Sequence, residues 1–123
     1  METAGANKEQ VQRFLDDFHQ KAAVFGIVFR DYRDKNFNAL LKLEISSYRR
    51  NEIIAALQAG DYSEGPLPDT LHHLLEMWVF GKTEKKKEIY IKISMGSPNR
   101  QTICISFHIA EKSMNYPFKK TKK

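Results

Sequence analysis

Four side chains in the C-terminal third of the chain have types and spacing that could carry proton-transfer chemistry: Tyr90, Lys92, His108 and Glu111. An imidazole titrates near neutral pH and can give or take a proton. A carboxylate three residues away could orient it, an ammonium can bind a phosphate, and a phenol can stack on a base. This combination suits RNA, whose 2′-hydroxyl is a nucleophile that needs proton removal, charge stabilisation and a protonated leaving oxygen.

The same third of the chain is rich in cations. Residues 82–123 contain 11 Lys and Arg against 3 Asp and Glu, whereas residues 1–81 contain 9 against 12, and the whole chain has a net charge of +5. Such asymmetry favours a polyanion or an acidic protein as the partner, although lysines can also serve solubility alone. The candidates for binding phosphate or a base of RNA are Lys82, Lys85, Lys86, Lys87 and Tyr116.

Two predicted strands must position the four chemical side chains. Side chains of a strand alternate between its faces, so the stretch 88–95 places Tyr90 and Lys92 on one face. If it forms a hairpin with the stretch 102–109, that face also receives the polar set Thr102, Cys104, Ser106 and His108. A half-solvated antiparallel sheet ordinarily has one polar face. What favours a functional site is that a histidine at the strand end is followed by an acid and a basic tail.

Helices are predicted before this sheet, with apolar residues at helical spacing. Their ranges are 8–23, 36–43 and about 46–59, the last with Ser46 or Ser47 as N-cap and Gly60 just beyond its end.

Strands are predicted at 23–29, 77–81, 88–95 and 102–109, with loops at 61–70 and 82–87. Short loops between consecutive strands require antiparallel pairing. The expected fold class is therefore α+β, a small antiparallel sheet with the N-terminal helices packed on one face.

The length of 123 residues fits a single domain, 1–123, with frayed tails at 1–7 and 119–123. No apolar run approaches the roughly 20 residues of a membrane span. The lone Cys104 cannot form an internal disulfide, which fits a reducing cytoplasm. The adjacent pair His72 and His73 would point in different directions, and there is no glycine-rich phosphate loop. We therefore predict neither a metal site nor a cofactor.

The segments DYSEGPLPD, EMWVFGK, EIYIKI and CISFHIAEKSMNYPF together resemble the MqsR-type toxins of bacterial type II toxin–antitoxin systems. The resemblance covers nearly the whole chain and is densest between Asp61 and Phe118. It implies a RelE-like α+β fold and a cytoplasmic endoribonuclease that cleaves mRNA. It also implies a cognate antitoxin, usually encoded adjacently, that binds and silences the enzyme.

The resemblance carries over to single residues only in part. The family's Tyr-x-Lys strand matches Tyr90 and Lys92, and His108 holds the place of a functional basic residue that follows Ser-Phe in the last strand. A lysine and a glutamine of the family have no clear counterpart around Ser63 or after Trp78. The chain also extends past its last strand through AEKSMNYPFKK, which indicates a divergent branch.

Two other functions fit the same residues. One is a non-catalytic module that binds RNA or DNA through the basic sheet face. The other is a protein-interaction domain whose basic third docks an acidic partner. RNA cleavage in the presence of a chelator separates the ribonuclease from both, and salt-sensitive RNA binding without cleavage indicates the first alternative.

Overall fold

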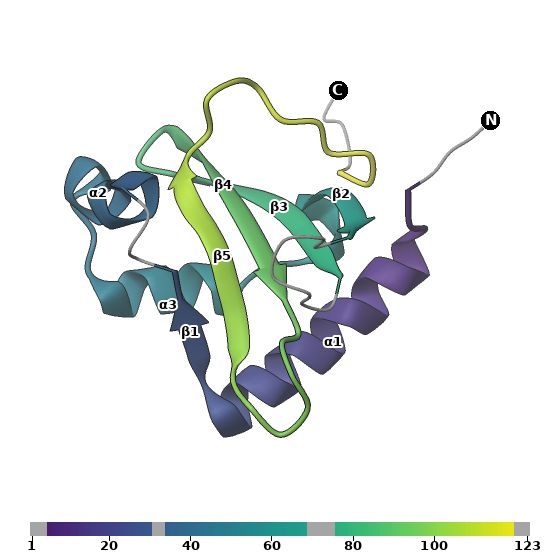
Figure 1. Ribbon diagram of the computed structural model, residues 1–123. Coiled ribbons are helices and arrows are strands. Elements are labelled where there is room, and N and C mark those ends of the chain that lie inside the picture. Colours follow the sequence, from purple (N-terminus) through teal and green to yellow (C-terminus); the bar gives the residue numbers. More distant parts are fainter. Residues whose placement is uncertain (1–4, 31–33, 69–75, 120–123) are drawn as a thin grey trace.

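The structure is a computed structural model that describes residues 5–30, 34–68 and 76–119 (Figure 1). Its helical elements are α1 (Lys8–Phe25), α2 (Asp34–Leu43), α3 (Ser47–Ala55) and the 3-10 turn η1 (Ala59–Asp61). Its strands are β1 (Ile27–Phe29), β2 (Tyr62–Leu67), β3 (Met77–Glu84), β4 (Lys87–Ser94) and β5 (Thr102–Ile109).

The strands form one sheet in the order β1-β5-β4-β3-β2. The pairs β2–β3, β3–β4 and β4–β5 are antiparallel, whereas β1 pairs with β5 in parallel. The predicted α+β class is confirmed and is consistent with a RelE-like fold, but the sheet is mixed rather than antiparallel. A parallel pair needs a long connection, which α2, α3 and the other strands provide between β1 and β5.

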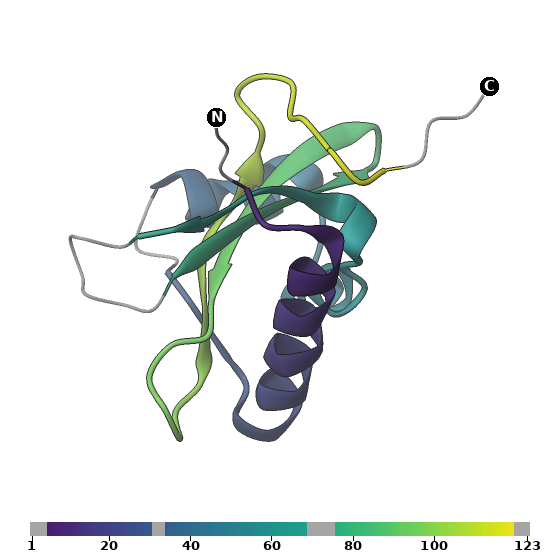
Figure 2. The same ribbon diagram turned by 90° about the vertical axis from the view of Figure 1, so that its right-hand side faces the viewer.

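The helices cover one face of this sheet, as predicted (Figures 1 and 2). The Phe14 ring of α1 stacks on Trp78 of β3 with ring centroids 4.6 Å apart. Phe18 of α1 and Ile91 of β4 are fully buried in the same core. Because alternate residues of β4 enter the core, Tyr90 lies on the opposite face of the sheet.

Several element boundaries differ from the prediction. The helix α1 continues to Phe25 and ends at Gly26, whose φ of 87° is accessible to glycine, so the strand predicted over 23–29 is reduced to Ile27–Phe29. The helix predicted over 46–59 has Ser46, one of its two predicted N-caps, but ends at Ala55.

The two predicted loops are also partly wrong. The stretch 61–70 contains β2, an edge strand whose pairing with β3 shifts in register. The loop 82–87 contracts to a two-residue turn, because Glu84 already pairs with Lys87. Lys85 and Lys86 of that turn have φ of 52° and 68°, the left-handed conformation that type I′ hairpins require at both central positions.

A bulge changes which face of β5 meets the core. Between the pairs Lys92–Ser106 and Ile93–Cys104 the register shifts by one residue. A one-residue shift reverses the face of each side chain beyond it. Cys104 is therefore buried in the helix-facing core, and the prediction that it shares the polar face of Ser106 is wrong.

The edge of β5 beyond β1 is capped by one buried amide. Asn36 of α2 donates from Nδ2 to the carbonyl oxygen of Ile105 at 2.8 Å and accepts at Oδ1 from the amide of Phe107 at 3.1 Å. The side chain thus imitates a neighbouring strand just before His108, and it also donates to the carbonyl of Arg30 at 2.9 Å.

Both ends of the described chain contact the fold. Asn7 caps α1 and the Ala6 amide donates to the Tyr62 hydroxyl at 3.2 Å, so these two residues of the predicted frayed tail take part in the structure. At the other end Phe118 stacks on Tyr62 with centroids 5.4 Å apart. Residues 1–4 and 120–123 lie outside the described residues. Within the described ranges no helix combines the length and apolar character needed to cross a membrane.

Candidate active site

Tyr90 and His108 are direct cross-strand partners on the sheet face opposite the helices. Their rings stack with centroids 5.2 Å apart and an interplanar angle of 12°. The next pair on this face is Lys92 with Ser106. The predicted arrangement of Tyr90, Lys92 and His108 on one face is therefore present in the structure.

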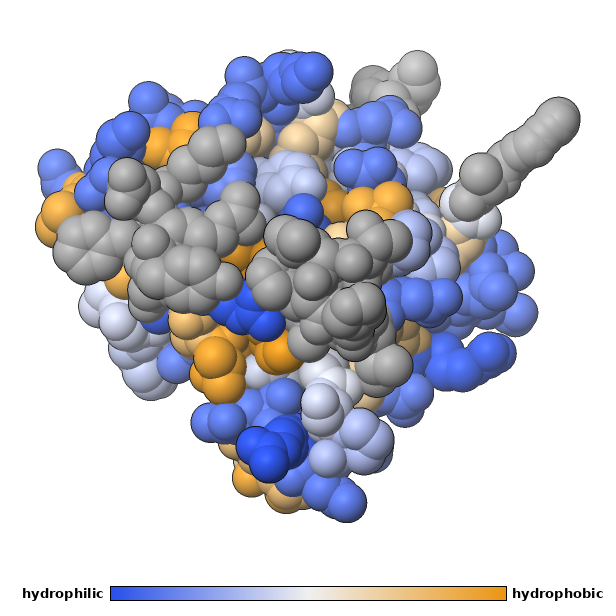
Figure 3. Space-filling view, in the orientation of Figure 1, coloured by the Kyte–Doolittle hydropathy of each residue, from blue (hydrophilic) through white to orange (hydrophobic). Residues whose placement is uncertain are grey.

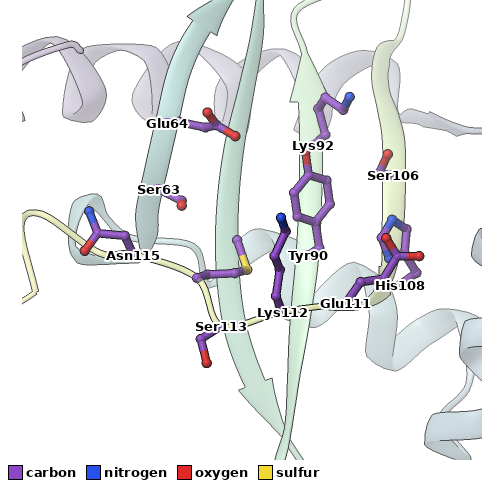
Figure 4. Close-up of a pocket in the computed structure, with 11 residues that line it drawn as sticks. Ser63, Glu64, Tyr90, Lys92, Ser106, His108, Glu111, Lys112, Ser113 and Asn115 are labelled. Atoms are coloured by element: carbon purple, nitrogen blue, oxygen red, sulfur yellow. The ribbon is translucent and has the colours of Figure 1, made fainter. Parts of the chain in front are cut away.

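These side chains line a cavity of about 560 Å³ (Figure 4). Its walls come from β2, β4, β5 and the stretch 110–119 that follows β5, which we call the C-terminal segment. Cavities of 300–1,000 Å³ are usual for small-molecule ligands, and the volume of this one lies within that range. The lining residues are Ser63, Glu64, Tyr90, Lys92, Ser106, His108, Glu111, Lys112, Ser113, Met114 and Asn115.

The imidazole of His108 contacts the backbone at the end of β5. Its Nδ1 lies 3.1 Å from the carbonyl oxygen of Ile109. Because a carbonyl can only accept, this contact is a hydrogen bond when Nδ1 carries the proton, and the lone pair of the neutral ring is then on Nε2. Glu111, which is predicted to orient this imidazole, lines the same cavity (Figure 4).

The charges in the cavity are mixed rather than uniformly positive. Lys92 lies on the sheet and Lys112 on the C-terminal segment, and both line the cavity (Figure 4). Glu64 on β2 and Glu111 bring two carboxylates to the same lining. The cavity therefore offers both cations for phosphate and acceptors for the donor groups of a base.

Lys112 and Glu64 were not among the predicted site residues. Glu64 lies in a stretch whose glycine and prolines predict a loop, and only its pairing with Val79 places it beside the site. Lys112 follows the last strand in a stretch without periodicity, so no pattern assigns it a direction. The one available signal was its position directly after Glu111.

Lys82 lies on the wrong face for the role predicted for it. It pairs with Ile89 in the β3–β4 ladder, so it points to the side opposite Tyr90. Its Nζ is 2.8 Å from Oδ2 of the buried Asp61. The prediction failed because residues 82–84 continue β3 instead of forming a loop, and alternation then turns Lys82 away from the cavity.

The other predicted phosphate-binding lysines lie outside the cavity. Lys85, Lys86 and Lys87 are exposed at the end of the β3–β4 hairpin. The Lys85 ammonium donates to the carbonyl oxygen of Glu44 at 2.8 Å. The β3–β4 hairpin ends in the upper part of the molecule in Figure 1, and the surface there is mainly hydrophilic (Figure 3). These lysines can contact only RNA that extends beyond the cavity.

Tyr116 anchors the C-terminal segment and is not a free stacking platform. Its hydroxyl donates to Glu88 Oε2 at 2.6 Å, and a Cβ at Gly81 would come within 2.1 Å of that hydroxyl. Partial burial, together with the Glu88 carboxylate, raises the pKa of Tyr116 above its usual value. The predicted role of Tyr116 in RNA stacking is therefore replaced by a structural one.

Among the residues that the structure describes, no group of three or more His, Cys, Asp or Glu is placed to hold a metal ion. His72 and His73 lie outside that part of the chain. Comparison with known proteins found no matching family model, no similar curated protein and no similar solved structure. The resemblance to the MqsR-type toxins therefore stays a prediction.

Proposed function

We propose that the cavity is the active site of an endoribonuclease that cleaves RNA through its 2′-hydroxyl. The observation that carries this proposal is the stacked pair Tyr90–His108 with Lys92 on the adjacent pair of the same face. A proton-transfer group, an aromatic ring and a cation thereby meet in one cavity. Since RNA contains its own nucleophile, these residues can act without a metal ion or a cofactor.

In this mechanism His108 Nε2 takes the proton of the 2′-hydroxyl or passes one to the leaving 5′ oxygen. Glu111 orients the imidazole and stabilises it once it is protonated. Lys92 binds the phosphate and the charge that develops on it in the transition state. A positioned proton-transfer group contributes about 10²–10⁴-fold in rate, and charge stabilisation is usually at least as important.

The biological role that we propose is that of a toxin in a bacterial toxin–antitoxin system, acting on mRNA in the cytoplasm. The resemblance in sequence supports this role, and so does the cationic C-terminal third. The natural partner is an adjacently encoded antitoxin with an acidic surface that covers the cavity. Co-expression with the neighbouring gene product and pull-down at low and moderate salt tests this partner, and failure to copurify at both salt concentrations contradicts it.

Replacement of His108 tests the catalytic proposal. The residue is 8% exposed and its ring is stacked on Tyr90, so His108→Ala would also remove packing. His108→Phe keeps an aromatic ring against Tyr90 but cannot transfer a proton. We expect it to melt near the wild-type temperature and to lose about 10²–10⁴-fold in cleavage rate.

The assay is cleavage of single-stranded RNA by purified protein in a chelator, with thermal melts as the folding control. Lys92→Gln should lower both RNA affinity and rate, because a phosphate contact acts in the ground state and in the transition state. Cleavage by His108→Phe at the wild-type rate contradicts the mechanism. Salt-sensitive RNA binding by a wild-type protein that does not cleave indicates a binding module instead.

A further inference from the structure

The C-terminal segment forms one wall of the cavity, although it contains no helix or strand. It supplies Glu111, Lys112, Ser113, Met114 and Asn115 to the lining. An irregular stretch that leaves a sheet would ordinarily be mobile. The segment can therefore contribute to a site only if specific contacts hold it in place.

One residue of β4 holds the segment at three places. The Glu88 carbonyl accepts from the amide of Ala110 at 2.8 Å. The Glu88 carboxylate accepts from the amide of Met114 at 3.3 Å and from the hydroxyl of Tyr116 at 2.6 Å. Both ends of the stretch 110–116 thus converge on Glu88, and Lys112 lies within the resulting loop.

The sheet leaves room for the Tyr116 ring at one position. Gly81 is the β3 neighbour of Tyr90, and the Tyr116 ring occupies the place of its missing side chain. Further along, Lys119 Nζ lies 4.7 Å from the centre of the Tyr116 ring. The segment is therefore fastened on both sides of Tyr116, by Glu88 and by contacts of the residues that follow.

We propose that Lys112 is the second phosphodiester-binding cation of the cavity and that the Tyr116–Glu88 contact positions it. Lys92 lines the cavity from the sheet and Lys112 lines it from the C-terminal segment (Figure 4), so a phosphodiester held in the cavity could contact both ammonium groups. Two ammonium groups on separate elements can neutralise a phosphate that a single surface cation holds weakly. This inference rests on the proposed function only in taking the phosphodiester to be that of RNA.

The probe is a short single-stranded 2′-O-methyl RNA, which lacks the nucleophile and binds without being cleaved. Lys112→Gln should lower its affinity about tenfold, as expected for loss of a hydrogen bond to a charged group. It should also reduce the slope of log affinity against log salt by about 0.7. Lys42→Gln, which makes the same charge change at an exposed position of α2, is the matched control and should leave both quantities unchanged.

Tyr116→Phe tests the positioning role, because it removes the hydroxyl and keeps the ring. It should weaken binding of the probe in the wild-type background and have no further effect in the Lys112→Gln background. A segment that merely supports the fold would give the same loss in both backgrounds. Equal losses in the two backgrounds would overturn the positioning role. Affinity of Lys112→Gln equal to that of Lys42→Gln would overturn the site.

Cleavage of unmodified RNA by the wild-type protein, measured in parallel, separates this inference from the proposed function. Lys112-dependent binding without cleavage keeps the phosphodiester site and refutes the ribonuclease. Cleavage together with binding that is independent of Lys112 keeps the ribonuclease and refutes the proposed role of Lys112. A wild-type protein that does not bind the probe refutes the phosphodiester site itself.

Discussion

Gly81→Ala should destabilise the protein only while Tyr116 is present. A Cβ at this position would lie 2.1 Å from the Tyr116 hydroxyl oxygen and 2.8 Å from two carbons of its ring. Real Cβ atoms do not approach other atoms so closely, so the ring must move. It then loses its 2.6 Å hydrogen bond to the Glu88 carboxylate.

Two opposing terms set the size of the effect. A hydrogen bond to a charged group contributes about 1.5–3 kcal/mol to the free energy of unfolding. Alanine in a strand is favoured over glycine by about 0.5–1 kcal/mol, because glycine loses more chain entropy on folding. The difference predicts that Gly81→Ala lowers the free energy of unfolding by about 1–2 kcal/mol. In a Tyr116→Ala background the clash is gone, and the same substitution should stabilise the protein by about 0.5–1 kcal/mol.

Urea unfolding of the four proteins in this cycle, followed by circular dichroism, measures both values. Gly60→Ala is the control, since its Cβ would meet Lys119 at 3.9 Å and Phe118 at 4.0 Å, which are ordinary contacts. It should be neutral or slightly stabilising. Destabilisation by Gly81→Ala of the same size with and without Tyr116 would refute the placement of this ring and the anchoring of the C-terminal segment.

Three further predictions concern the fold around the site. Asn36→Ala removes three hydrogen bonds, one of them from the Phe107 amide, and should lower the free energy of unfolding by about 2–4 kcal/mol in urea titrations; a loss below about 0.5 kcal/mol would contradict the bridging role. The double substitution Lys85→Asn, Lys86→Gly suits the left-handed turn better and should stabilise the protein by about 1 kcal/mol; RNA affinity that does not fall alongside would show that neither lysine binds RNA. Because the pKa of Tyr116 is raised above its ordinary 10.0 in the folded protein, the stability advantage of wild type over Tyr116→Phe should be full below about pH 10 and shrink as the pH rises above it; an advantage that is constant from pH 8 to 11 would contradict this linkage.

Alternation along two strands was readable from the amino-acid sequence alone. The polar positions of 88–95 and 102–109 predict one shared face for Tyr90, Lys92 and His108, and the structure has this face. Period-two alternation is a local property, since neighbouring side chains of any strand point to opposite faces. The helices and the α+β class were predictable for the same reason, because helical spacing and an N-cap are local signals.

Only the tertiary structure decided which other residues reach the site. Lys82 does not reach the site, because β3 continues through residues that the sequence predicts to be a loop. Cys104 does not share the polar face, because of the bulge in β5. Lys112 lines the site because Glu88, 24 positions earlier in the sequence, accepts hydrogen bonds from the C-terminal segment and holds it against the sheet. Strand pairing, bulges and anchored loops depend on contacts between distant parts of the chain, and no local pattern of residues encodes them.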